Sequence, residues 1–588
     1  MFKNVYYSIN TNTIHLWEQL KGENLYTNIP YVPYAFKRKK DGDFKTTDGF
    51  NAKKIEFKSY SDYYSACKDQ KDLYEDRVRP EIQFLAERYY GIDDELMDVP
   101  KLKNYVIDIE THSDSGKFPD INNADDPITL ISVHNNITGI TTTFGTKPYN
   151  GKYKNVDFIN YIECKNDKML LMSFFNFMSK SPCDTISGWY INGFDIPYII
   201  NRSKNLFGND TAIYKKLSPI SIVKTWMSKD GKDMNVDIAG VSILDYIDLY
   251  KWYSPNRLER YSLDFVSNFE LGVGKLDYSE YEDLRGLYNN NWEKYVDYNI
   301  IDAYRVHQID DKLKYINLVQ TLSLLCKSPM KNYRTLTQLI EGLMLTYYRR
   351  RGLCAPHFTG GVQEGFEAAY VKEPQKGKHM WVVDLDIASS YPTAIITLNM
   401  SPETYYGRVL GFTENEIMTF TKTKCYPSFN LMKGSKIIDF KNKSLEIFNK
   451  AIKNRLLSVA PCGSVFSNSK MGVVADVEKT VFKKRIKVKK KMIKMKKSLS
   501  VLRNDDLKNT KEKINQYHSL QLALKLVLNG FFGIMSVPYS RYFNINIAEA
   551  ITSCGRQTIK NGERFVNELL NEPSQELIDI INKIKGEL

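Results

Sequence analysis

YVIDIE, residues 105–110, reads as an apolar strand that carries two acidic side chains. Asp108 and Glu110 stand two residues apart, and alternate residues of a strand point to the same side. Two close carboxylates in an apolar strand are costly unless a cation neutralises them. In isolation such a pattern is more often a strand end with solvated acids, so the interpretation depends on the rest of the chain.

Two later segments supply further acidic residues. GWYINGFDIPYIINR (188–202) places Asp195 after a Gly-Phe turn, at the start of an apolar helix. YVDYNIIDAYRV (295–306) places Tyr298 and Asp302 one helical turn apart on one helix face. Each segment alone is weak evidence for a site, and the weight comes from their order along the chain.

Strands and helices alternate around these acidic segments. This alternation predicts an α/β domain over residues 101–313. The expected strands are 105–110, 129–136, 141–146 and 184–189, and the expected helix is 170–178.

The flanking regions have different patterns. Residues 1–100 mix short alternating stretches with an exposed basic loop around 37–48, which predicts a small α+β domain. Residues 314–355 have Leu and Tyr at helical spacing and are expected to pack back on that domain. Two long helices, 478–500 and 508–532, are expected further on, separated by the polar turn LRNDDLKN.

Composition limits the class of protein. A chain of 588 residues suggests roughly four domains at ordinary domain size. The net charge of +13 suggests a polyanionic partner such as nucleic acid, because Lys and Arg neutralise phosphates. The eight cysteines are scattered without a CxxC pair, which is typical of reduced thiols. The N-terminus has no apolar signal core, and no membrane span is expected.

A second set of candidate residues follows residue 380. WVVDLD (381–386) reads as a buried strand, and VVDLDIASSYPTAIITL (382–398) places Asp386 five residues before Tyr391, with Asp384 as a lower-ranked alternative acid on the same strand face. KLVLNGFFG (525–533) places Lys525 and Asn529 on one helix face. VFKKRIKVKKKMIKMKK (481–497) holds ten Lys and Arg residues, which in isolation indicate only a solvated basic helix face.

In their order, the first three acidic segments resemble the motifs of proofreading 3′–5′ exonucleases of the DEDDy type. The resemblance implies a ribonuclease H-like domain in which four carboxylates hold two Mg²⁺ ions, with Mn²⁺ as an alternative. Hydrolysis of a phosphodiester needs a metal-activated water and a second metal on the leaving oxygen. Tyr298 would orient that water, and Phe194 would shape the single-strand channel. The implied metal ligands are Asp108, Glu110, Asp195 and Asp302.

The second set resembles motifs A and B of family B DNA polymerases, and the whole resemblance runs from about residue 100 to 570. It is nearest to T-even-type bacteriophage replicases. It implies that Asp386 binds metal and that Tyr391 packs under the sugar of the incoming nucleotide. The residues implied to contact the triphosphate are Arg485, Lys489, Lys525 and Asn529. The chain departs from the family pattern at Tyr190, Ser390, Gly530 and Phe532.

The resemblance implies a multidomain α/β and α+β protein. Its parts would be an N-terminal domain, an exonuclease domain, a partial palm and helical fingers. The implied boundaries are 1–100 with 314–355 for the N-terminal domain, 101–313 for the exonuclease, 356–465 for the first part of the palm, 466–538 for the fingers and 539–588 for the start of a second palm segment.

Nothing resembling motif C, the family's Asp-Thr-Asp turn, follows motif B. We therefore expect a split polymerase of a bacteriophage, active in the cytoplasm of the infected bacterial host. A second chain would carry motif C, the thumb and the tail that binds a sliding clamp. The expected partners are primer–template DNA, single-stranded DNA and deoxynucleoside triphosphates, with no membrane.

Two alternatives remain open at this point. One is a 3′–5′ exonuclease of single-stranded DNA that acts without a polymerase partner. The other is a non-catalytic DNA-binding remnant. The complete set of exonuclease carboxylates argues against the remnant, and the intact nucleotide-contacting residues argue against the pure nuclease.

Overall fold

The computed structural model describes most of the chain, and the described residues form two compact units. One unit comprises 1–32, 79–335 and 495–523, and the other comprises 33–78, 336–494 and 524–588. The described residues are 1–70, 72–91, 99–113, 116, 118–153, 158–208, 210–362, 365–374, 376–378, 386–501, 503–571, 575 and 578–579.

The first unit begins with a three-stranded antiparallel sheet. Its strands are β1 (Phe2–Ser8), β2 (Thr13–Leu20) and β3 (Glu23–Pro30), in that order. Helix α2 (Pro80–Arg88) packs on β1. Residues 33–78 belong to the second compact unit, and the domain boundary expected at residue 100 stays a prediction.

A six-stranded mixed sheet forms the centre of the first unit. The strand order is β11-β10-β9-β8-β12-β15. Strand β9 pairs antiparallel with β8 and β10, whereas the pairs β10–β11, β8–β12 and β12–β15 are parallel. The strands are β8 (Asn104–Thr111), β9 (Ile128–Asn135), β10 (Thr141–Gly145), β11 (Ile159–Glu163), β12 (Thr185–Gly188) and β15 (Ser242–Asp245).

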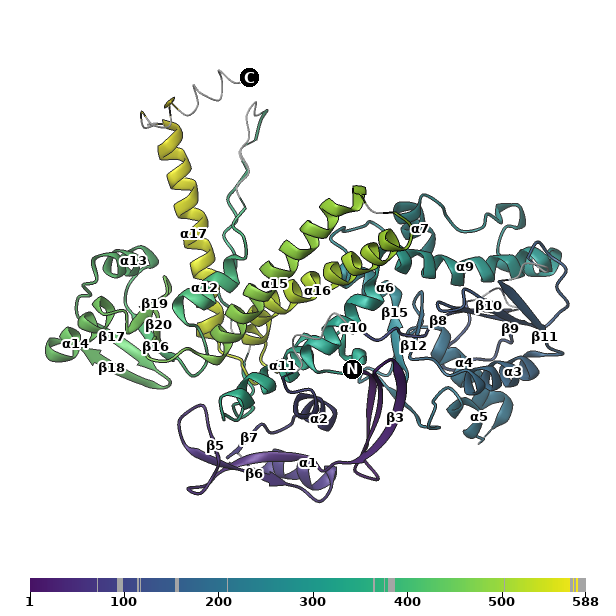
Figure 1. Ribbon diagram of the computed structural model, residues 1–588, viewed down its shortest axis with the longest axis horizontal. Helices are drawn as coiled ribbons and strands as arrows, with labels where there is room; N and C mark the ends of the chain where they lie inside the picture. The colour runs from purple at the N-terminus through teal and green to yellow at the C-terminus, as the bar shows by residue number, and fades with distance from the viewer. Residues whose placement is uncertain are drawn as a thin grey trace. The chain divides into compact units, whose positions relative to one another are not determined.

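Helices cover both faces of this sheet (Figure 1). On one face lie α3 (Asp167–Lys180), α4 (Asp195–Phe207) and α5 (Ala212–Lys215), and on the other lies α9 (Trp292–Leu313). The odd-numbered residues of β8, such as Ile107 and Ile109, pack in the hydrophobic core with α3 and α4. The even-numbered residues therefore face α9, as the alternation of a strand requires.

Smaller elements complete the first unit. A β-ribbon, β13 (Val223–Met227) with β14 (Met234–Ile238), lies beside α4, and α10 packs against α6. The helix α10 is bonded to the segment before β8, because Gln320 donates to the Pro100 carbonyl at 2.7 Å. The helices are α6 (Tyr246–Tyr253), α7 (Leu263–Leu271), α8 (Leu284–Asn290), α10 (Tyr315–Cys326), η1 (Ser279–Tyr281) and η2 (Met330–Asn332).

The second unit contains a four-stranded sheet with strand order β5-β6-β4-β7. The elements are β4 (Tyr34–Arg38), β5 (Phe44–Lys45), β6 (Asn51–Glu56), β7 (Leu73–Tyr74), α1 (Tyr60–Asp69) and α11 (Leu336–Arg350). The loop expected at 37–48 thus includes the end of β4 and all of β5. A bidentate ion pair between Glu75 and Arg349, with both N···O distances at 2.5 Å, joins this region to α11.

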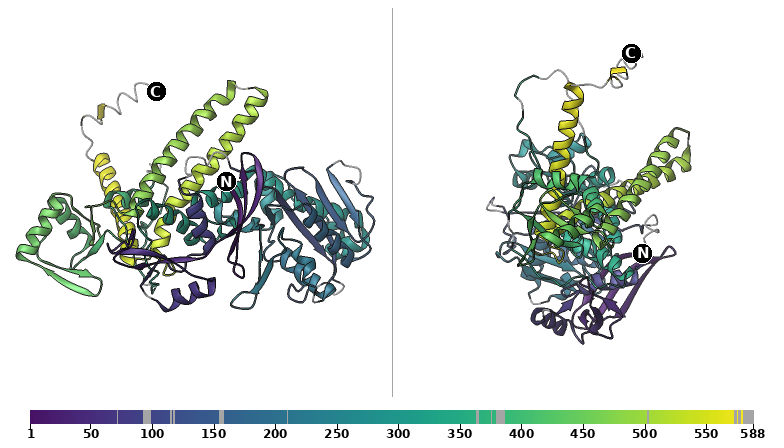
Figure 2. Two further views of the ribbon diagram at one scale, coloured as in Figure 1. Left: turned by 60° about the horizontal axis from the view of Figure 1, so that its bottom comes forward. Right: turned by 90° about the vertical axis from the view of Figure 1, so that its left-hand side faces the viewer.

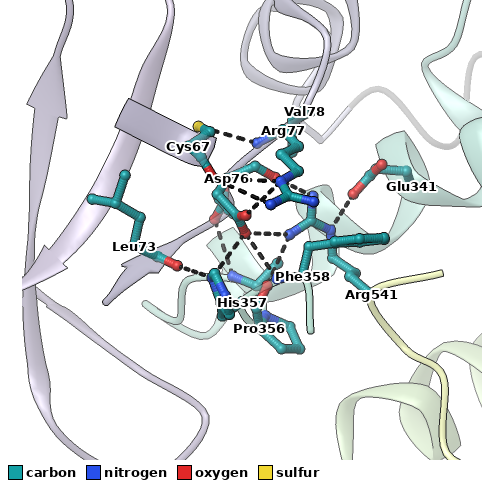
Figure 3. Close-up of polar contacts among 12 residues, drawn as sticks. Cys67, Leu73, Asp76, Arg77, Val78, Glu341, Pro356, His357, Phe358 and Arg541 are labelled. Carbon is teal, nitrogen blue, oxygen red and sulfur yellow. Dashed lines mark hydrogen bonds and ion pairs between the residues drawn. The ribbon is translucent and has the colours of Figure 1, made fainter. Parts of the chain in front are cut away.

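A buried polar network ties distant segments of the second unit together (Figure 3). The guanidinium of Arg541 pairs with Glu341 and donates to the carbonyls of Pro356 at 2.8 Å and Asp76 at 2.5 Å. His357 Nδ1 lies 2.7 Å from the Leu73 carbonyl. Because Asp76 is fully buried, its charge needs neutralisation, and Arg541 and Arg77 both form ion pairs with it.

A five-stranded antiparallel sheet occupies the region expected to be palm. Helices α13 (Glu414–Thr423) and α14 (Asn442–Lys453) pack with it around a core that includes Leu431 and Phe448. Its strands, in the order β18-β17-β16-β20-β19, are β16 (Tyr405–Leu410), β17 (Phe429–Lys433), β18 (Lys436–Phe440), β19 (Leu457–Val459) and β20 (Ser464–Ser467). The strand expected at 381–386, with Asp384, lies outside the described residues except for Asp386.

Three long helices follow this sheet in the described part of the chain (Figures 1 and 2). These are α15 (Val473–Ser498), α16 (Asn504–Ser536) and α17 (Ile545–Asn571), with the short η3 (Leu499–Val501) between the first two. Two helices were expected here, but the polar turn is shorter than expected because α16 already begins at Asn504.

One helix bears on the expectation that the chain has no membrane span. Within the described residues, the segment Asp506–Ser536 of α16 is long and apolar enough, by length and composition, to cross a membrane. More than half of its apolar window is buried inside the fold. The core helix of a protein outside membranes passes the same test, so the segment carries no argument for a membrane.

Candidate active site

The acidic residues of β8 face α9, where a buried asparagine meets one of them. Asn299 donates from Nδ2 to Asp108 Oδ2 at 2.7 Å. Asn299 follows Tyr298 in sequence and precedes Asp302 by three residues, so one stretch of α9 presents all three side chains. The helix expected at 295–306 is confirmed, and the predicted set gains a partner that the sequence reasoning missed.

A lysine lies among the same residues. Lys275, from the loop before η1, forms an ion pair with Asp302 and donates to the Tyr298 hydroxyl at 2.7 Å. The second oxygen of Asp302, Oδ1, is buried and has no hydrogen-bond partner. Lys275 was not predicted as a site residue.

Asp195 reaches the β8 acids from a third part of the chain. It is the first residue of α4, as expected, and its Oδ1 accepts a hydrogen bond from the backbone N–H of Ile109 at 3.1 Å. Ile109 stands between Asp108 and Glu110, so this bond ties the start of α4 to the strand that carries both acids. Asp195 is buried.

Burial and mutual repulsion govern the electrostatics of these four carboxyls. Burial, followed by the charges of Asp302, Glu110 and Asp195, raises the pKa of Asp108 well above its usual range. Burial and Asp302 raise the pKa of Glu110 to about 8, and burial raises that of Asp195 to about 7. The four acids are therefore near enough to destabilise one another's charged forms.

Burial also raises the pKa of Asp302, although the Lys275 ammonium opposes this. For Lys275 itself, burial lowers the pKa, but the charges of Asp302 and its neighbours overcome that effect and leave the ammonium protonated. The lysine thus supplies one positive charge to a cluster of four acids.

The donor set fits a hard divalent cation. Carboxylate oxygens are the ligands that Mg²⁺ prefers, and a cation would remove the repulsion that raises these pKa values. In the conformation described, however, no three His, Cys, Asp or Glu side chains among the described residues are grouped so that they could jointly hold a metal. Asn299 engages Asp108 and Lys275 engages Asp302, so these side chains would have to turn to share one ion.

Aromatic side chains flank the loop that precedes Asp195. The rings of Phe194 and Phe118 lie 5.4 Å apart, and Phe118 is 79% exposed. Tyr190, where the family pattern differs, is 52% exposed and rests its ring against Gly193. These rings give the acidic cluster an apolar rim.

The residues of the second predicted site belong to the second unit. Asp386 is exposed, and the Tyr391 ring at the start of α12 (Ser390–Leu398) lies 5.1 Å from the Phe532 ring of α16. Arg485 of α15 approaches Ser389 at 3.5 Å. Motif A residues therefore meet residues of both long helices.

The remaining predicted residues of this site point to solvent. Lys489 on α15 is exposed, as are Lys525 and Asn529 on α16. The expected helix face of Lys525 and Asn529 is present, since both lie on one continuous helix four residues apart. Their contact with a triphosphate stays a prediction.

Comparison with known proteins places both halves of the chain in one family. The pattern described as DNA polymerase family B, exonuclease domain, matches residues 53–266, and the pattern described as DNA polymerase family B matches 330–587. Asp108, Glu110 and Asp195 fall inside the first match, whereas Tyr298 and Asp302 fall between the two.

Individual relatives are similar over most of the chain. A DNA-directed DNA polymerase of Escherichia phage RB69 is 29% identical over 81% of this chain and 56% of its own length. A DNA-directed DNA polymerase of Enterobacteria phage T4 is 24% identical over 97% of this chain and 67% of its own length. The catalytic subunit of DNA polymerase delta from Caenorhabditis elegans is 24% identical over 79% of this chain and 39% of its own length. The chain thus spans about half to two thirds of these phage relatives.

Proposed function

Because the chain belongs to DNA polymerase family B and carries both its exonuclease and its polymerase regions, we propose that it removes nucleotides from the 3′ end of single-stranded DNA and binds nucleotides for template-directed synthesis. The observation that supports the nuclease most directly is the meeting of acids from three distant segments. Asp108, Asp195 and Asp302 come from β8, α4 and α9, and their charges affect one another.

The four acids of this cluster would be the ligands of the metals once the side chains of Asp108 and Asp302 turn from their present partners. Two Mg²⁺ ions bound there would supply an activated water and stabilise the charge on the leaving oxygen. The domain that carries these acids is proposed to have a ribonuclease H-like fold. Mn²⁺ is the alternative to Mg²⁺ as the bound ion. The four ligands are Asp108, Glu110, Asp195 and Asp302.

Neighbouring side chains orient the reactants. Lys275 donates to the Tyr298 oxygen, and the Tyr298 hydroxyl hydrogen-bonds Asp302, so it would turn from that carboxylate to bond the attacking water or a phosphate oxygen. Burial raises the pKa of Tyr298, so that hydrogen is retained at neutral pH. Phe194 and Phe118 form an apolar surface for the terminal base.

The nuclease proposal is tested by removing one ligand. Asp108→Ala should lower Mg²⁺-dependent degradation of single-stranded DNA by more than about 10²-fold, because even outer-shell partners of metals typically contribute 10–100-fold. Asp277→Ala removes an exposed acid of the same unit and should leave the rate unchanged. Full activity in Asp108→Ala would contradict the ligand assignment.

The nucleotide-binding proposal rests on the second unit. Tyr391 packs against Phe532, and Arg485 lies beside Ser389 at the start of α12. Tyr391, the proposed contact to the sugar, would therefore lie near Arg485, a proposed contact to the phosphates. Asp386 would bind the metal of the triphosphate. Arg suits bidentate phosphate contact, and the exposed lysines act as point charges. The residues proposed to contact the phosphates are Arg485, Lys489, Lys525 and Asn529.

Fluorescence titration with a labelled deoxynucleoside triphosphate measures this binding. Arg485→Ala and Lys525→Ala should each weaken it by roughly tenfold, which corresponds to about 1.4 kcal/mol. Lys436→Ala, an exposed lysine on β18, serves as the matched control. Equal affinities in all three variants would refute the phosphate contacts.

Synthesis itself is proposed to need, in addition to the 588 residues, a polypeptide segment of this or another chain that carries motif C and the thumb, with a sliding clamp bound through that segment. This part rests on the resemblance to phage replicases, as does the host cytoplasm as the site of action. Primer extension by the purified 588-residue chain should fail and should recover when that segment is added. Extension by the single chain would disprove the requirement.

A further inference from the structure

The loop between β12 and α4 leads directly into Asp195, and hydrogen bonds to a residue of the neighbouring strand β15 hold its backbone. Strands β12 and β15 are parallel neighbours, and Gly188 at the end of one pairs with Asp245 at the end of the other. The Asp245 carboxylate, 1% exposed, accepts a hydrogen bond from the Tyr190 N–H through Oδ1 at 3.2 Å. Its Oδ2 accepts one from the Asn192 N–H at 3.0 Å.

The loop conformation requires such a partner. Tyr190 has a φ of 67°, a left-handed conformation that side chains other than glycine adopt at a cost. Its ring lies so close to Gly193 that a Cβ there would stand 2.2 Å from the ring. Two amides that point at one buried carboxylate offset this strain, since an ionised acceptor forms strong hydrogen bonds with N–H groups.

The conformation of the loop is transmitted to the acidic cluster. The N-terminus of α4 has no side-chain cap at Phe194, and its Ile196 amide bonds back to the Ile191 carbonyl at 3.2 Å. The first turn of α4 is thus fastened to the loop rather than capped independently. Asp195, which begins that turn, bonds the Ile109 amide between the two acids of β8.

We propose that Asp245 is a positioning residue of the nuclease: by clamping the Tyr190 and Asn192 amides, it sets the place of Asp195 relative to Asp108 and Glu110. This inference rests on the proposed nuclease function. The hydrogen bonds of the Asp245 carboxylate go to the backbone amides of Tyr190, Asn192 and Ile247, so it positions Asp195 through the loop, although its charge also raises the pKa of Asp195.

Asp245 has a second role that can be separated from the first. It caps α6, because its Oδ1 also accepts a hydrogen bond from the Ile247 N–H at 3.2 Å. Serine is an equally good cap residue, and its hydroxyl reaches the same amide of its own helix. Asp245→Ser therefore preserves the cap and removes the clamp, whereas Asp245→Ala removes both.

A matched control exists in the same unit. Asp310 is a carboxylate near the end of α9 that accepts hydrogen bonds from the Ile316 N–H and the Tyr246 hydroxyl, both at 3.1 Å. Among the described residues, its carboxylate accepts no hydrogen bond from the loop that connects β12 to α4. Asp310→Asn therefore reports the effect of disturbing a well-bonded acid of this unit without the clamp.

The experiment compares wild type, Asp245→Ser and Asp310→Asn in the full chain by three measurements. Hydrogen–deuterium exchange of the peptide covering 189–195, without metal, should accelerate at least tenfold in Asp245→Ser only. Binding of Mn²⁺, followed by its paramagnetic resonance signal, should weaken about 10–100-fold, as for outer-shell partners of metal ligands. The turnover rate on single-stranded DNA should fall by a similar factor, while melting temperature changes little.

Unchanged exchange in Asp245→Ser would overturn the clamp. Faster exchange with wild-type Mn²⁺ affinity would overturn the link from the loop to Asp195, as would equal losses in Asp310→Asn. If the wild type neither binds Mn²⁺ nor degrades DNA, the proposed nuclease function fails instead. The exchange measurement still decides the clamp in that case, because it needs no activity.

Discussion

Replacing Gly188 by alanine should damage the nuclease site without removing any of its functional groups. Gly188 is the last residue of β12 and lies buried between β8 and β15. A Cβ at this position would stand 2.5 Å from the carbonyl oxygen of Ile107, the peptide group that precedes Asp108. It would also stand 3.0 Å from the Ile191 side chain.

The size of the effect follows from that distance. Ordinary van der Waals contact begins near 3.4 Å, so the two strands must separate by about 0.9 Å. The clashing atom belongs to the backbone of a paired strand and cannot swing away, as a side-chain terminus would. Overpacking of this kind typically costs about 1–3 kcal/mol. A misplacement of about 1 Å near reacting groups can reduce a rate by roughly 10²-fold.

Two assays measure these consequences. The melting temperature of Gly188→Ala should fall by about 2–12 °C, the range for such a loss in a domain of this size. Mg²⁺-dependent degradation of single-stranded DNA should fall by about 10²-fold. Gly562→Ala is the control, since Gly562 lies in α17 with open space around it. An alanine variant at 188 with wild-type melting temperature and wild-type degradation would refute the close approach of β12 to β8.

Three further outcomes are expected. Lys275→Met should lower the turnover rate on single-stranded DNA about tenfold, and it should lower the Mg²⁺ concentration needed for half-maximal rate, because the ammonium competes with a cation for Asp302; a raised Mg²⁺ requirement would contradict this. Arg541→Leu should reduce the free energy of unfolding by about 3–5 kcal/mol in chemical denaturation, because the buried Asp76 and the partly buried Glu341 would both lose this arginine; a change below about 1 kcal/mol would contradict it. Burial, and to a smaller extent His307, lowers the pKa of His134 to about 4. The unfolded chain therefore takes up this proton first as the pH falls below 6.5, and stability should drop by about 2 kcal/mol between pH 7 and 5 in wild type but less in His134→Gln. Identical pH dependence of the two proteins would show that His134 is not the group responsible.

The elements that carry the acids were predictable because their side chains follow simple periods. The strand at 105–110 is β8, and its alternation put Asp108 and Glu110 on one face as expected. The helix at 295–306 is part of α9, and its period placed Tyr298 and Asp302 together. Both features depend on local geometry alone, which a sequence displays directly.

The partners of those acids were not predictable in the same way. Lys275 lies 27 positions before Asp302 in a loop, and Asp245 lies 55 positions after Tyr190. No periodic pattern relates residues at such separations, because only the pairing of strands and the packing of helices brings them together. Asn299 could have been predicted, because it precedes Asp302 by three residues on the same helix and so lies on the same helix face.

The division into units was also hidden from the sequence. Residues 1–32 and 33–78 read as one small α+β domain, yet they belong to different units. Two buried acids explain why residues 33–78 belong to the second unit. Glu75 pairs with Arg349 and Asp76 pairs with Arg541, and both arginines come from much later in the chain. An ion pair between residues so far apart in the sequence cannot be predicted before the fold is known.

Gly530, one of the departures from the family pattern, has a physical reason in the packing of α16 on α11. As an isolated residue in a helix it predicts a loosened α16, yet the helix continues through it. A Cβ there would stand 2.6 Å from Ile340 Cδ1 and 3.0 Å from Leu336 Cδ1, both on α11. The glycine thus permits α11 to approach α16 closely, and the packing on Ile340 restricts the freedom that the missing side chain would otherwise give. Flexibility of α16 at this position is therefore governed by its contact with α11 rather than by the glycine alone.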